Sequence, residues 1–367
     1  MRVGVIREIK DQECRVALTP TQAHVLVTGG HEVAVEYAAG AGAGYSDQDY
    51  ADAGALLCTT TAAWTSDLVL KVKEPLPSEY TFFDGQILFT YLHLAGVSYT
   101  LTMALVKAQM TAIAYENVTD GNGQFPLLAP MSAIAGNMAA SVANFYLART
   151  QGGKGIQLGN ILGERHGRIL VIGDGTVGQH AARTADALGA KVTLFGRQPD
   201  KTAHLRSECS ATLQFSESTA DTISAALLDA DAVIGAVLLP GARAPHVVTE
   251  AMVKSMQAGS VIVDVSIDQG GCIETSRPTH HSDPVYVMHD VVHYAVTNMP
   301  GAYPRTATKA LTQATFPYIQ SLADKGLDAL NNNAGFTAGV NVHRGMINNH
   351  AVATTHQLDK LYQPFTI

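Results

Sequence analysis

The feature that most constrains this chain is a glycine motif that directly follows a strand pattern. An apolar run at 168–172 leads into Gly-Asp-Gly-Thr-Val-Gly at 173–178, and a helical pattern follows. A strand, a G-x-G-x-x-G turn and a helix in this order are typical of the dinucleotide-binding βα unit. We expect Gly173 to permit the tight turn, Gly175 to let a pyrophosphate approach the backbone, and Gly178 to let the helix pack closely on the strand. The alternative interpretation is a glycine-rich turn that binds nothing.

Composition favours a well-buried α/β enzyme. Of 367 residues, 47% are hydrophobic and 15% are charged, which separates the chain from disordered proteins. The formal net charge is −8 and no basic block is present, so nucleic acid is not the expected partner. No apolar run approaches the length of a membrane span.

The cysteines and the first residues indicate a cytoplasmic protein. The four cysteines lie far apart, form no C-x-x-C pair and are expected to be reduced thiols, at Cys14, Cys58, Cys209 and Cys272. A strand pattern begins already at Arg2, so we expect no cleaved signal peptide. We also expect no metal site.

Repeated βα patterns indicate a mainly parallel sheet in the first part of the chain. A capped helix opens at Thr19-Pro20 and stops at Gly29-Gly30. The apolar or β-branched runs that predict strands are Val3–Ile6, Glu32–Glu36, Leu68–Val72, Ile87–Tyr91 and Thr111–Tyr115.

The later patterns predict a second sheet and a discontinuous first domain. One long helix is expected at 131–151, and residues after about 305 read as helical, at 306–325 and again near 344–356. Strand patterns follow the glycine motif at Lys191–Phe195, Asp231–Gly235 and Ser260–Asp264. We therefore predict an α/β protein with two Rossmann-type, doubly wound domains: a substrate domain of residues 1–128 and 306–367, and a dinucleotide-binding domain of residues 129–305.

Four polar residues lie where predicted strands end, and in doubly wound sheets ligands bind outside the carboxyl ends of the strands. Arg15 can clamp a carboxylate through parallel N–H bonds, and Lys73 can hold a carboxylate or polarise a carbonyl. Histidine as a residue type titrates near neutral pH, so a histidine at position 93 suits proton transfer, and Asp268 can orient water or an ammonium group. Taken singly, each residue has a structural or surface interpretation, and the four together favour a site.

Beyond these four residues, the chain resembles the alanine dehydrogenase and pyridine-nucleotide transhydrogenase family nearly end to end. The segments that carry the resemblance are Glu13–Pro20, Leu70–Pro75, Tyr91–Ala95, Leu127–Ser132, Gly235–Gly241, Val263–Cys272 and Thr297–Pro300.

The resemblance implies reversible oxidative deamination of L-alanine to pyruvate and ammonium with a nicotinamide cofactor. The family's substrate-binding residues fall on Arg15 and Lys73, and its catalytic residues fall on His93 and Asp268. It also implies a homo-oligomer, typically a hexamer. Besides Gly173, Gly175 and Gly178, the implied cofactor contacts fall on Ser132, Thr176, Val177, Gly196, Arg197, Lys201, Ser216, Val237, Leu238, Ile267, Arg277, Asn298 and Met299.

The residues expected to select the cofactor depart from the pattern of NAD enzymes. About 20 residues past the glycine loop such enzymes carry an acidic residue that binds the adenosine ribose, but here Gly196-Arg197 ends the strand. Arg197, with Lys201 assisting, is suited to a 2′-phosphate, so the residues favour NADP(H) slightly over NAD(H). Asp174 lies inside the glycine loop, where a carboxylate is unfavourable unless it points away from the pyrophosphate.

Other functions remain open. One is an NADP-dependent paralogue that acts on another small 2-oxo acid or amino acid, including opine-type reductive condensation with an amine. A second is a transhydrogenase-like nucleotide-binding subunit, a branch in which the resemblance implies no histidine at the position of His93. A third is a catalytically silent nucleotide-binding protein.

Overall fold

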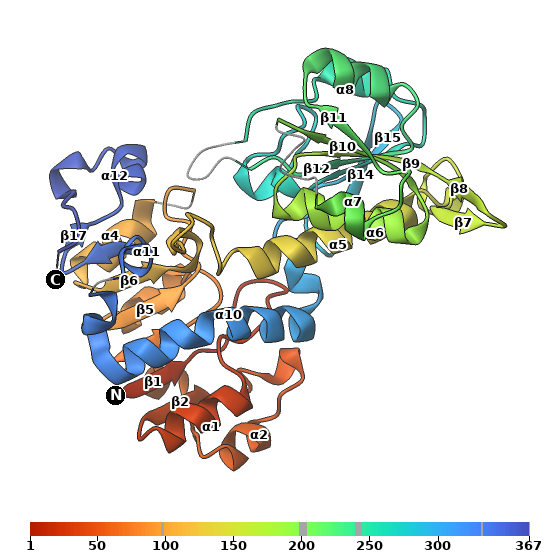
Figure 1. Cartoon of the computed structure of the whole chain (residues 1–367). Coiled ribbons are helices and arrows are strands. Elements are labelled where there is room, and N and C mark those ends of the chain that lie inside the picture. Colours follow the sequence, from red (N-terminus) through yellow and green to blue (C-terminus); the bar gives the residue numbers. More distant parts are fainter. Residues whose placement is uncertain (97–98, 198–203, 239–243, 332, 367) are drawn as a thin grey trace. The chain divides into compact units, whose positions relative to one another are not determined.

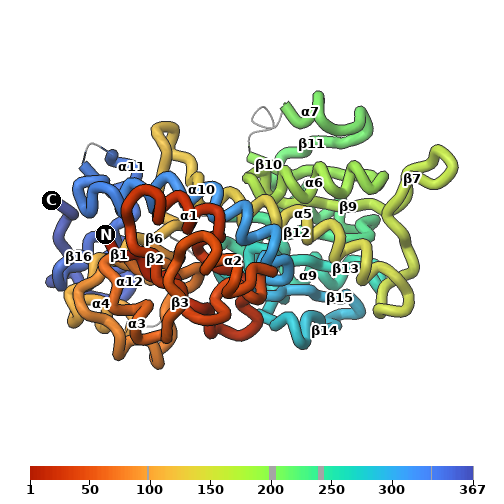
Figure 2. The backbone as a smooth tube through the Cα atoms, turned by 90° about the horizontal axis from the view of Figure 1, so that it is seen from below, coloured from red at the N-terminus to blue at the C-terminus, as the bar shows by residue number. Residues whose placement is uncertain are grey.

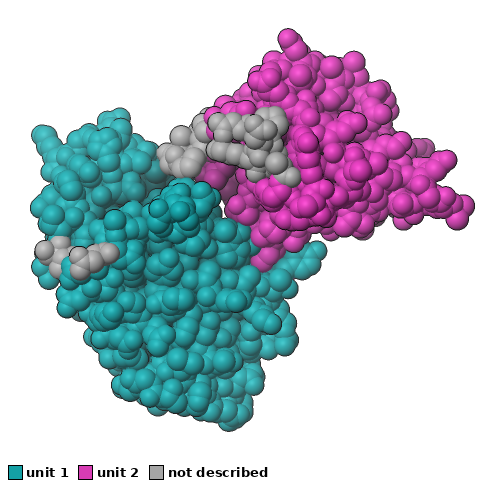
Figure 3. All heavy atoms as spheres, viewed as in Figure 1, with its two compact units in different colours: residues 1–131, 303–367 teal, residues 132–302 magenta. Residues whose placement is uncertain are grey.

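The chain forms two compact units. The computed structural model describes residues 1–96, 99–197, 204–238, 244–331 and 333–366. Unit 1 comprises Met1–Met131 and Tyr303–Ile367, and unit 2 comprises Ser132–Ala302 (Figure 3). The predicted domain boundaries, at 128/129 and 305/306, lie close to these limits.

Unit 1 is built on an eight-stranded sheet in the order β17-β16-β6-β5-β4-β1-β2-β3. The chain fills one side of β1 with β2 and β3 and then crosses to the other side with β4, so the direction of winding switches between β1 and β4. The parallel strands are β1 (Arg2–Val5), β2 (Glu32–Glu36), β3 (Leu56–Cys58), β4 (Leu68–Leu70), β5 (Ile87–Thr90) and β6 (Thr111–Ala114). Two antiparallel strands complete the edge, β16 (Val340–His343) and β17 (Met346–Ile347).

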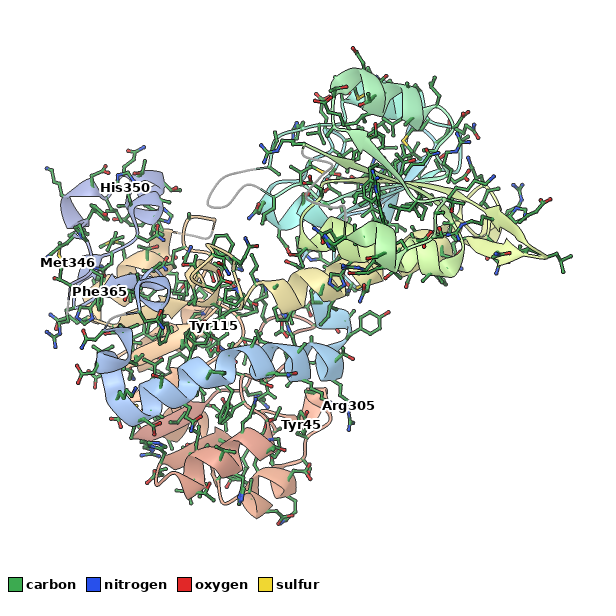
Figure 4. The ribbon with its side chains drawn as sticks, viewed as in Figure 1. Tyr45, Tyr115, Arg305, Met346, His350 and Phe365 are labelled. Atoms are coloured by element: carbon green, nitrogen blue, oxygen red, sulfur yellow. The ribbon has the colours of Figure 1, made fainter. Side chains whose placement is uncertain are left out.

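Helices cover this sheet, and its interior is apolar. Trp64, Leu88 and Leu105 belong to one core cluster that joins helices and strands, and Tyr115 lies in the interior of the unit against Phe89 (Figure 4). The helices of unit 1 are α1 (Pro20–Thr28), α2 (Asp47–Asp52), α3 (Thr60–Trp64), α4 (Tyr99–Lys107), α10 (Pro304–Lys325), α11 (Ala334–Thr337) and α12 (His350–His356).

Unit 2 holds a seven-stranded sheet in the order β11-β10-β9-β12-β13-β15-β14 (Figure 1). Its strands are β9 (Arg168–Ile172), β10 (Lys191–Gly196), β11 (Gln214–Glu217), β12 (Ala232–Gly235), β13 (Val261–Asp264) and β15 (Val291–Tyr294), all parallel, and the antiparallel β14 (Val285–Met288). Its helices are α5 (Ala129–Tyr146, which begins at the unit boundary), α6 (Thr176–Leu188), α7 (Leu205–Glu208), α8 (Ala220–Leu227) and α9 (Glu250–Lys254).

Strand β9 shows how both faces of this sheet are buried. Ile169 and Val171 pack into one cluster with α5 and α6, while Leu170 and Ile172 pack into another with α8 and α9. Successive side chains of a strand point to opposite faces, so an unbroken apolar run is what a doubly covered parallel strand requires. In each unit the six parallel strands, counted in chain order, lie as 3-2-1-4-5-6, which confirms the predicted α/β fold with two Rossmann-type sheets.

Two predictions of secondary structure are wrong in part. The helix expected at 131–151 runs instead over Ala129–Tyr146, and a separate 3₁₀ turn follows at Arg149–Gln151. The segment near 344–356 is helical only from His350, because β16 and β17 form an antiparallel edge before it. The sequence also gave no indication of the β7–β8 hairpin (Gly159–Ile161 and Glu164–His166), which extends from the body of unit 2 (Figure 2).

Candidate active site

Three of the four predicted site residues lie at one edge of the sheet in unit 1. Arg15 lies in the connection after β1, Lys73 follows β4, and His93 follows β5. These strands are parallel neighbours, so their carboxyl ends meet at the edge where the winding direction switches and where ligands bind in such sheets. Asp268 belongs to unit 2, where it follows β13 at the carboxyl edge of the second sheet.

Arg15 is a buried cation held by a carboxylate. Its side chain is 2% exposed, and its Nε donates to Oε1 of Glu13 at 2.6 Å while Nη2 donates to Oε2. Nη1 faces Sδ of Met131 at 3.0 Å. Burial alone would lower the pKa of Arg15, and the bond and charge of Glu13 outweigh it, so the pKa is raised. The arginine is therefore fixed in position with its charge intact, and the interpretation as a solvated surface residue is wrong.

The turn that carries Lys73 is fixed by residues that the sequence analysis missed. Glu8, just after β1, accepts from the backbone N–H groups of Val72 at 2.6 Å and Lys73 at 3.2 Å. It also pairs with the fully buried ammonium of Lys71 at 3.2 Å, and Glu79 pairs with the same ammonium at 2.8 Å. Lys71 therefore has a structural role, while the half-buried Lys73 next to it is the lysine at the sheet edge.

Burial changes the ionisation of this cluster. The pKa of Glu8 is raised, chiefly by burial, although the charge of Lys71 opposes the shift. For Lys71, burial would lower the pKa, and the carboxylates of Glu8 and Glu79 outweigh it and raise the pKa. The sequence did hold a signal for this ion pair: an acidic residue follows β1 and a lysine directly follows β4, and these two strands are neighbours in a sheet of this order.

His93 has an unusual backbone that Glu116 holds. Its φ is 48°, in the left-handed region that few non-glycine residues adopt. The carboxylate of Glu116 accepts from the backbone N–H of His93 at 2.6 Å and from that of Leu92 at 3.2 Å. The imidazole Nδ1 lies 3.8 Å from the same carboxylate. Backbone strain of this kind is concentrated at functional sites, where the surrounding structure maintains it.

Tyr91 connects His93 to the interior of the sheet. The two rings stack with centroids 5.7 Å apart and an interplanar angle of 2°, and the Tyr91 hydroxyl donates to the Leu127 carbonyl at 2.6 Å. Burial raises the pKa of Tyr91 and keeps the phenol neutral, while the nearby charge of Arg15 opposes the shift. The histidine ring itself is 41% exposed, so one of its faces rests on the protein while the ring stays accessible to solvent.

In unit 2 the glycine loop has the shape that the motif predicts. Gly173 has a φ of +119°, and a Cβ there would lie 2.3 Å from the Ala236 carbonyl oxygen, so only glycine fits. A Cβ on Gly178 would lie 1.7 Å from the Gly173 carbonyl oxygen, which shows how closely α6 packs on the loop. A Cβ on Gly175 would meet no protein atom within 4 Å, and this residue caps α6 without a side-chain hydrogen bond. The loop therefore leaves room beside Gly175 at the N-terminus of α6, and a helix N-terminus without a side-chain cap fits a pyrophosphate.

Most of the other predicted cofactor residues lie at the same edge of the second sheet. Ser216 lies in β11 beside Phe195 of β10, and Asn298 follows β15 and donates its N–H to Oδ1 of Asp268 at 3.1 Å. Arg277 stacks its guanidinium over the Tyr286 ring at 4.2 Å. Gly196 is the last residue of β10, and those that follow a strand end are Arg197, Val237, Leu238, Ile267 and Met299. Ser132 lies in α5, and Lys201 falls outside the described residues.

Asp268 is exposed, and its carboxylate accepts from the backbone N–H of Asn298, which follows β15. It lies in the 3₁₀ turn Val265–Gln269, and the buried carboxylate of Asp264 organises this turn and the loop after it. Asp264 accepts from the backbone N–H groups of Ser266 at 3.0 Å and Cys272 at 3.0 Å. Burial raises the pKa of Asp264. The sequence analysis missed Asp264, although a carboxylate that ends a fully apolar strand was a usable signal.

The expectation that no carboxylate lies at the end of β10 is wrong. The sequence places no acidic residue at the end of β10, but the side chain of Asp174 lies against Gly196 there. A Cβ on Gly196 would be 2.4 Å from Oδ2 of Asp174. The glycine loop therefore supplies a carboxylate at the strand end that appeared to lack one.

Three further observations limit the chemistry. All four cysteines are free. Within the described ranges, no group of three or more His, Cys, Asp or Glu side chains is arranged to hold a metal ion. No helix in the part of the chain that the structure describes is long and apolar enough to cross a membrane.

Comparison with known proteins adds a family to this geometry. Residues 4–135 match the N-terminal domain and residues 139–350 the C-terminal domain of the family described as alanine dehydrogenase/PNT. Alanine dehydrogenase of Halomonas elongata is 48% identical over 98% of this chain and 98% of its own length. Alanine dehydrogenase 2 of Staphylococcus aureus strain Mu50 is 46% identical over 98% of this chain and 97% of its own.

Solved structures agree. An L-alanine dehydrogenase superimposes with a TM-score of 0.93 at 45% identity, over 97% of this chain and 99% of that chain. A transhydrogenase from Sinorhizobium meliloti superimposes with a TM-score of 0.81 at 25% identity, over 96% of this chain and 100% of that one. These likenesses, which span both units, show that the chain belongs to the alanine dehydrogenase/PNT family.

Proposed function

We propose that the chain is an alanine dehydrogenase, which converts L-alanine reversibly into pyruvate and ammonium with a nicotinamide cofactor. The observation that carries this proposal is the meeting of Arg15, Lys73 and His93 at one sheet edge, in a chain similar to alanine dehydrogenases over nearly its full length. Unit 1 is then the substrate domain and unit 2 the dinucleotide-binding domain. The glycine loop of unit 2 binds the pyrophosphate, and the bound nicotinamide supplies the hydride chemistry.

Arg15 and Lys73 bind and polarise the substrate. The buried guanidinium of Arg15, already oriented by Glu13, attracts the carboxylate of pyruvate or alanine. The ammonium of Lys73 stabilises negative charge on the carbonyl oxygen as that charge develops. Charges fixed before the reaction need no reorganisation during it, and this is the main electrostatic contribution of an active site.

His93 transfers protons in this scheme. In the reductive direction it takes a proton from the nitrogen as ammonia adds to the carbonyl, and it donates a proton to the departing hydroxyl as water leaves. Its ring is exposed on one side and stacked on Tyr91 on the other, so the transferring nitrogen has a defined position. Asp268 is assigned to hold the ammonia or water molecule. The family resemblance supports this last role.

The cofactor form, the assembly and the cellular site are finer proposals. Arg197 is exposed at the end of β10 and on sequence alone favours NADP(H). The carboxylate of Asp174 at the same place favours NAD(H), as argued in the next subsection. We also expect a homohexamer, to be checked by light scattering after gel filtration. A cytoplasmic site is proposed because the four cysteines are free, as expected in a reducing compartment.

The test is oxidation of NADH and of NADPH by pyruvate with and without ammonium, followed by absorbance. The proposal requires turnover that depends on ammonium. Turnover that needs another 2-oxo acid, or an amine larger than ammonia, would indicate the paralogue or opine-type reaction. Hydride exchange between two nicotinamide nucleotides without any 2-oxo acid would indicate a transhydrogenase.

A further inference from the structure

The residue at the end of the second strand, here β10, determines whether a dinucleotide-binding unit binds the free hydroxyls of the adenosine ribose or a 2′-phosphate. In NAD enzymes of this fold an acidic residue there binds the ribose hydroxyls. In this chain the position is Gly196, which is buried, and the exposed Arg197 follows it. The backbone of Gly196 is not in the left-handed region, so its conformation does not call for glycine.

The reason for glycine is the space taken by Asp174. The three protein atoms nearest to a Cβ built on Gly196 all belong to the Asp174 side chain: Oδ2 at 2.4 Å, and Cβ and Cγ at 2.7 Å each. Any side chain at position 196 would collide with this carboxyl group. The two segments are also joined by the hydrogen bond from Gly173 N–H to the Phe195 carbonyl at 2.9 Å. Asp174 therefore fills the place that a strand-end side chain would occupy.

The carboxylate of Asp174 has no other structural role that the described residues show. Gln179 donates its side-chain amide to the Asp174 backbone carbonyl at 2.9 Å, which fixes the main chain and not the acid. The N-terminus of α6 has no side-chain cap, so Asp174 does not serve as one. No described residue forms a hydrogen bond or an ion pair with its carboxylate, and Arg197, which directly follows Gly196, does not pair with it.

We propose that Asp174, from the glycine loop, replaces the missing strand-end acid, accepts hydrogen bonds from the adenosine ribose hydroxyls and selects NAD(H). A 2′-phosphate in the same place would meet a like charge, and this repulsion opposes the slight preference for NADP(H) that Gly196-Arg197 favours. The inference rests on the proposed nucleotide site in unit 2. It does not depend on which amino acid is oxidised.

The first test measures cofactor binding without substrate, by fluorescence titration of NADH and NADPH onto the full chain. Wild type binds NADH more tightly than NADPH. Asp174→Asn keeps the shape and removes the charge, and it weakens NADH binding by about tenfold or more, the size of one hydrogen bond to a charged group, while NADPH binding is unchanged or tighter. Asp221→Asn, in the exposed first turn of α8, is the control with the same change in net charge and leaves both affinities at the wild-type value.

The second test moves the acid from the loop to the strand. Gly196→Asp alone crowds two carboxyl groups and weakens NADH binding, and Asp174→Gly alone weakens it by removing the acceptor. The double variant Asp174→Gly with Gly196→Asp recovers NADH binding relative to both. Thermal unfolding of each variant without cofactor confirms that it is folded.

The proposal is overturned if wild type prefers NADPH, if Asp174→Asn weakens both cofactors equally, or if the folded double variant is no better than Asp174→Gly alone. Because no 2-oxo acid is present, a failure of the alanine dehydrogenase assignment appears in the turnover assay and not in these titrations.

Discussion

At the scale of single residues, the site depends on carboxylates that hold its residues in place, one from the same loop and one from a neighbouring strand end. Glu13 orients Arg15 and Glu116 holds the backbone of His93. The sequence analysis could find Arg15, Lys73 and His93 because each follows a strand. It could not find Glu116 as a partner of His93, because the two residues are 23 positions apart and come together only when β5 and β6 pair.

The histidine can be tested directly. We expect His93→Ala to lower kcat by about 10²–10⁴-fold, the usual contribution of a positioned acid–base group. The dissociation constant for the reduced cofactor stays at the wild-type value, because the glycine loop belongs to the other unit. Steady-state kinetics with pyruvate and ammonium and a cofactor titration check the two parts. Loss of cofactor binding would mean instead that His93 is structural.

Glu116 is a positioning residue, because it holds the backbone of His93 and does not itself transfer a proton. The variant Glu116→Gln tests this role. Glu116→Gln replaces a charged acceptor of two backbone N–H groups with a weaker, neutral one, so the left-handed turn at His93 is less well held. We expect kcat to fall about tenfold while the KM for pyruvate, bound by Arg15, changes little. A change in KM with kcat intact would contradict this role.

At the scale of elements, the sequence predicted nine of the twelve parallel strands, and it missed β3, β11 and β15 as well as the antiparallel edges. Strands such as β9 are buried on both faces and read as continuous apolar runs. β16 and β17 are short, and nothing local distinguishes them from the helical pattern before them. The contact between Asp174 and Gly196 is also non-local: it joins the loop after β9 to the end of the neighbouring strand β10, and no spacing rule predicts it.

The glycine loop allows a paired test of what each glycine does. Gly178→Ala places a methyl group 1.7 Å from the Gly173 carbonyl oxygen, so we expect a lower melting temperature and lost cofactor binding. Gly175→Ala meets no protein atom within 4 Å, and its φ of −77° suits alanine. We expect its melting temperature without cofactor to equal that of wild type while NADH binding weakens. A stable Gly175→Ala variant with full affinity would show that no ligand approaches this backbone.

The turn after β4 predicts a dependence of stability on pH. Lys71→Met leaves the buried carboxylates of Glu8 and Glu79 without their shared cation, so we expect the free energy of unfolding to fall by about 3 kcal/mol at pH 7. The pKa of Glu8 is already raised in the folded state and rises further in the variant. The folded protein then binds more protons than the unfolded one above the ordinary pKa of a glutamate, so the loss shrinks as pH falls towards 5. Urea unfolding at both pH values checks this, and an equal loss at both would contradict it.

At the scale of the whole molecule, the two units differ in how the chain builds them. Unit 2 is one continuous segment, and its two core clusters draw only on residues from Ala135 to Met299. Unit 1 needs both ends of the chain, because β16 pairs with β6 and the core cluster there includes Val342 and Val352. Independent cores are the property that lets domains fold alone.

We therefore expect a fragment of residues 129–302, which keeps α5 complete, to fold and to bind NADH with nearly the affinity of the full chain, because the glycine loop and Asp174 both lie within it. A fragment of residues 1–131 lacks α10 and the partner strand of β6, so its apolar sheet edge stays uncovered and it does not fold. Circular dichroism melting and NADH titration of both fragments test this, with Asp174→Asn in the longer one as the binding control. Cooperative melting of the 1–131 fragment would contradict the claim that unit 1 needs both ends of the chain. A 129–302 fragment that folds without binding NADH would contradict the claim that unit 2 alone holds the nucleotide site.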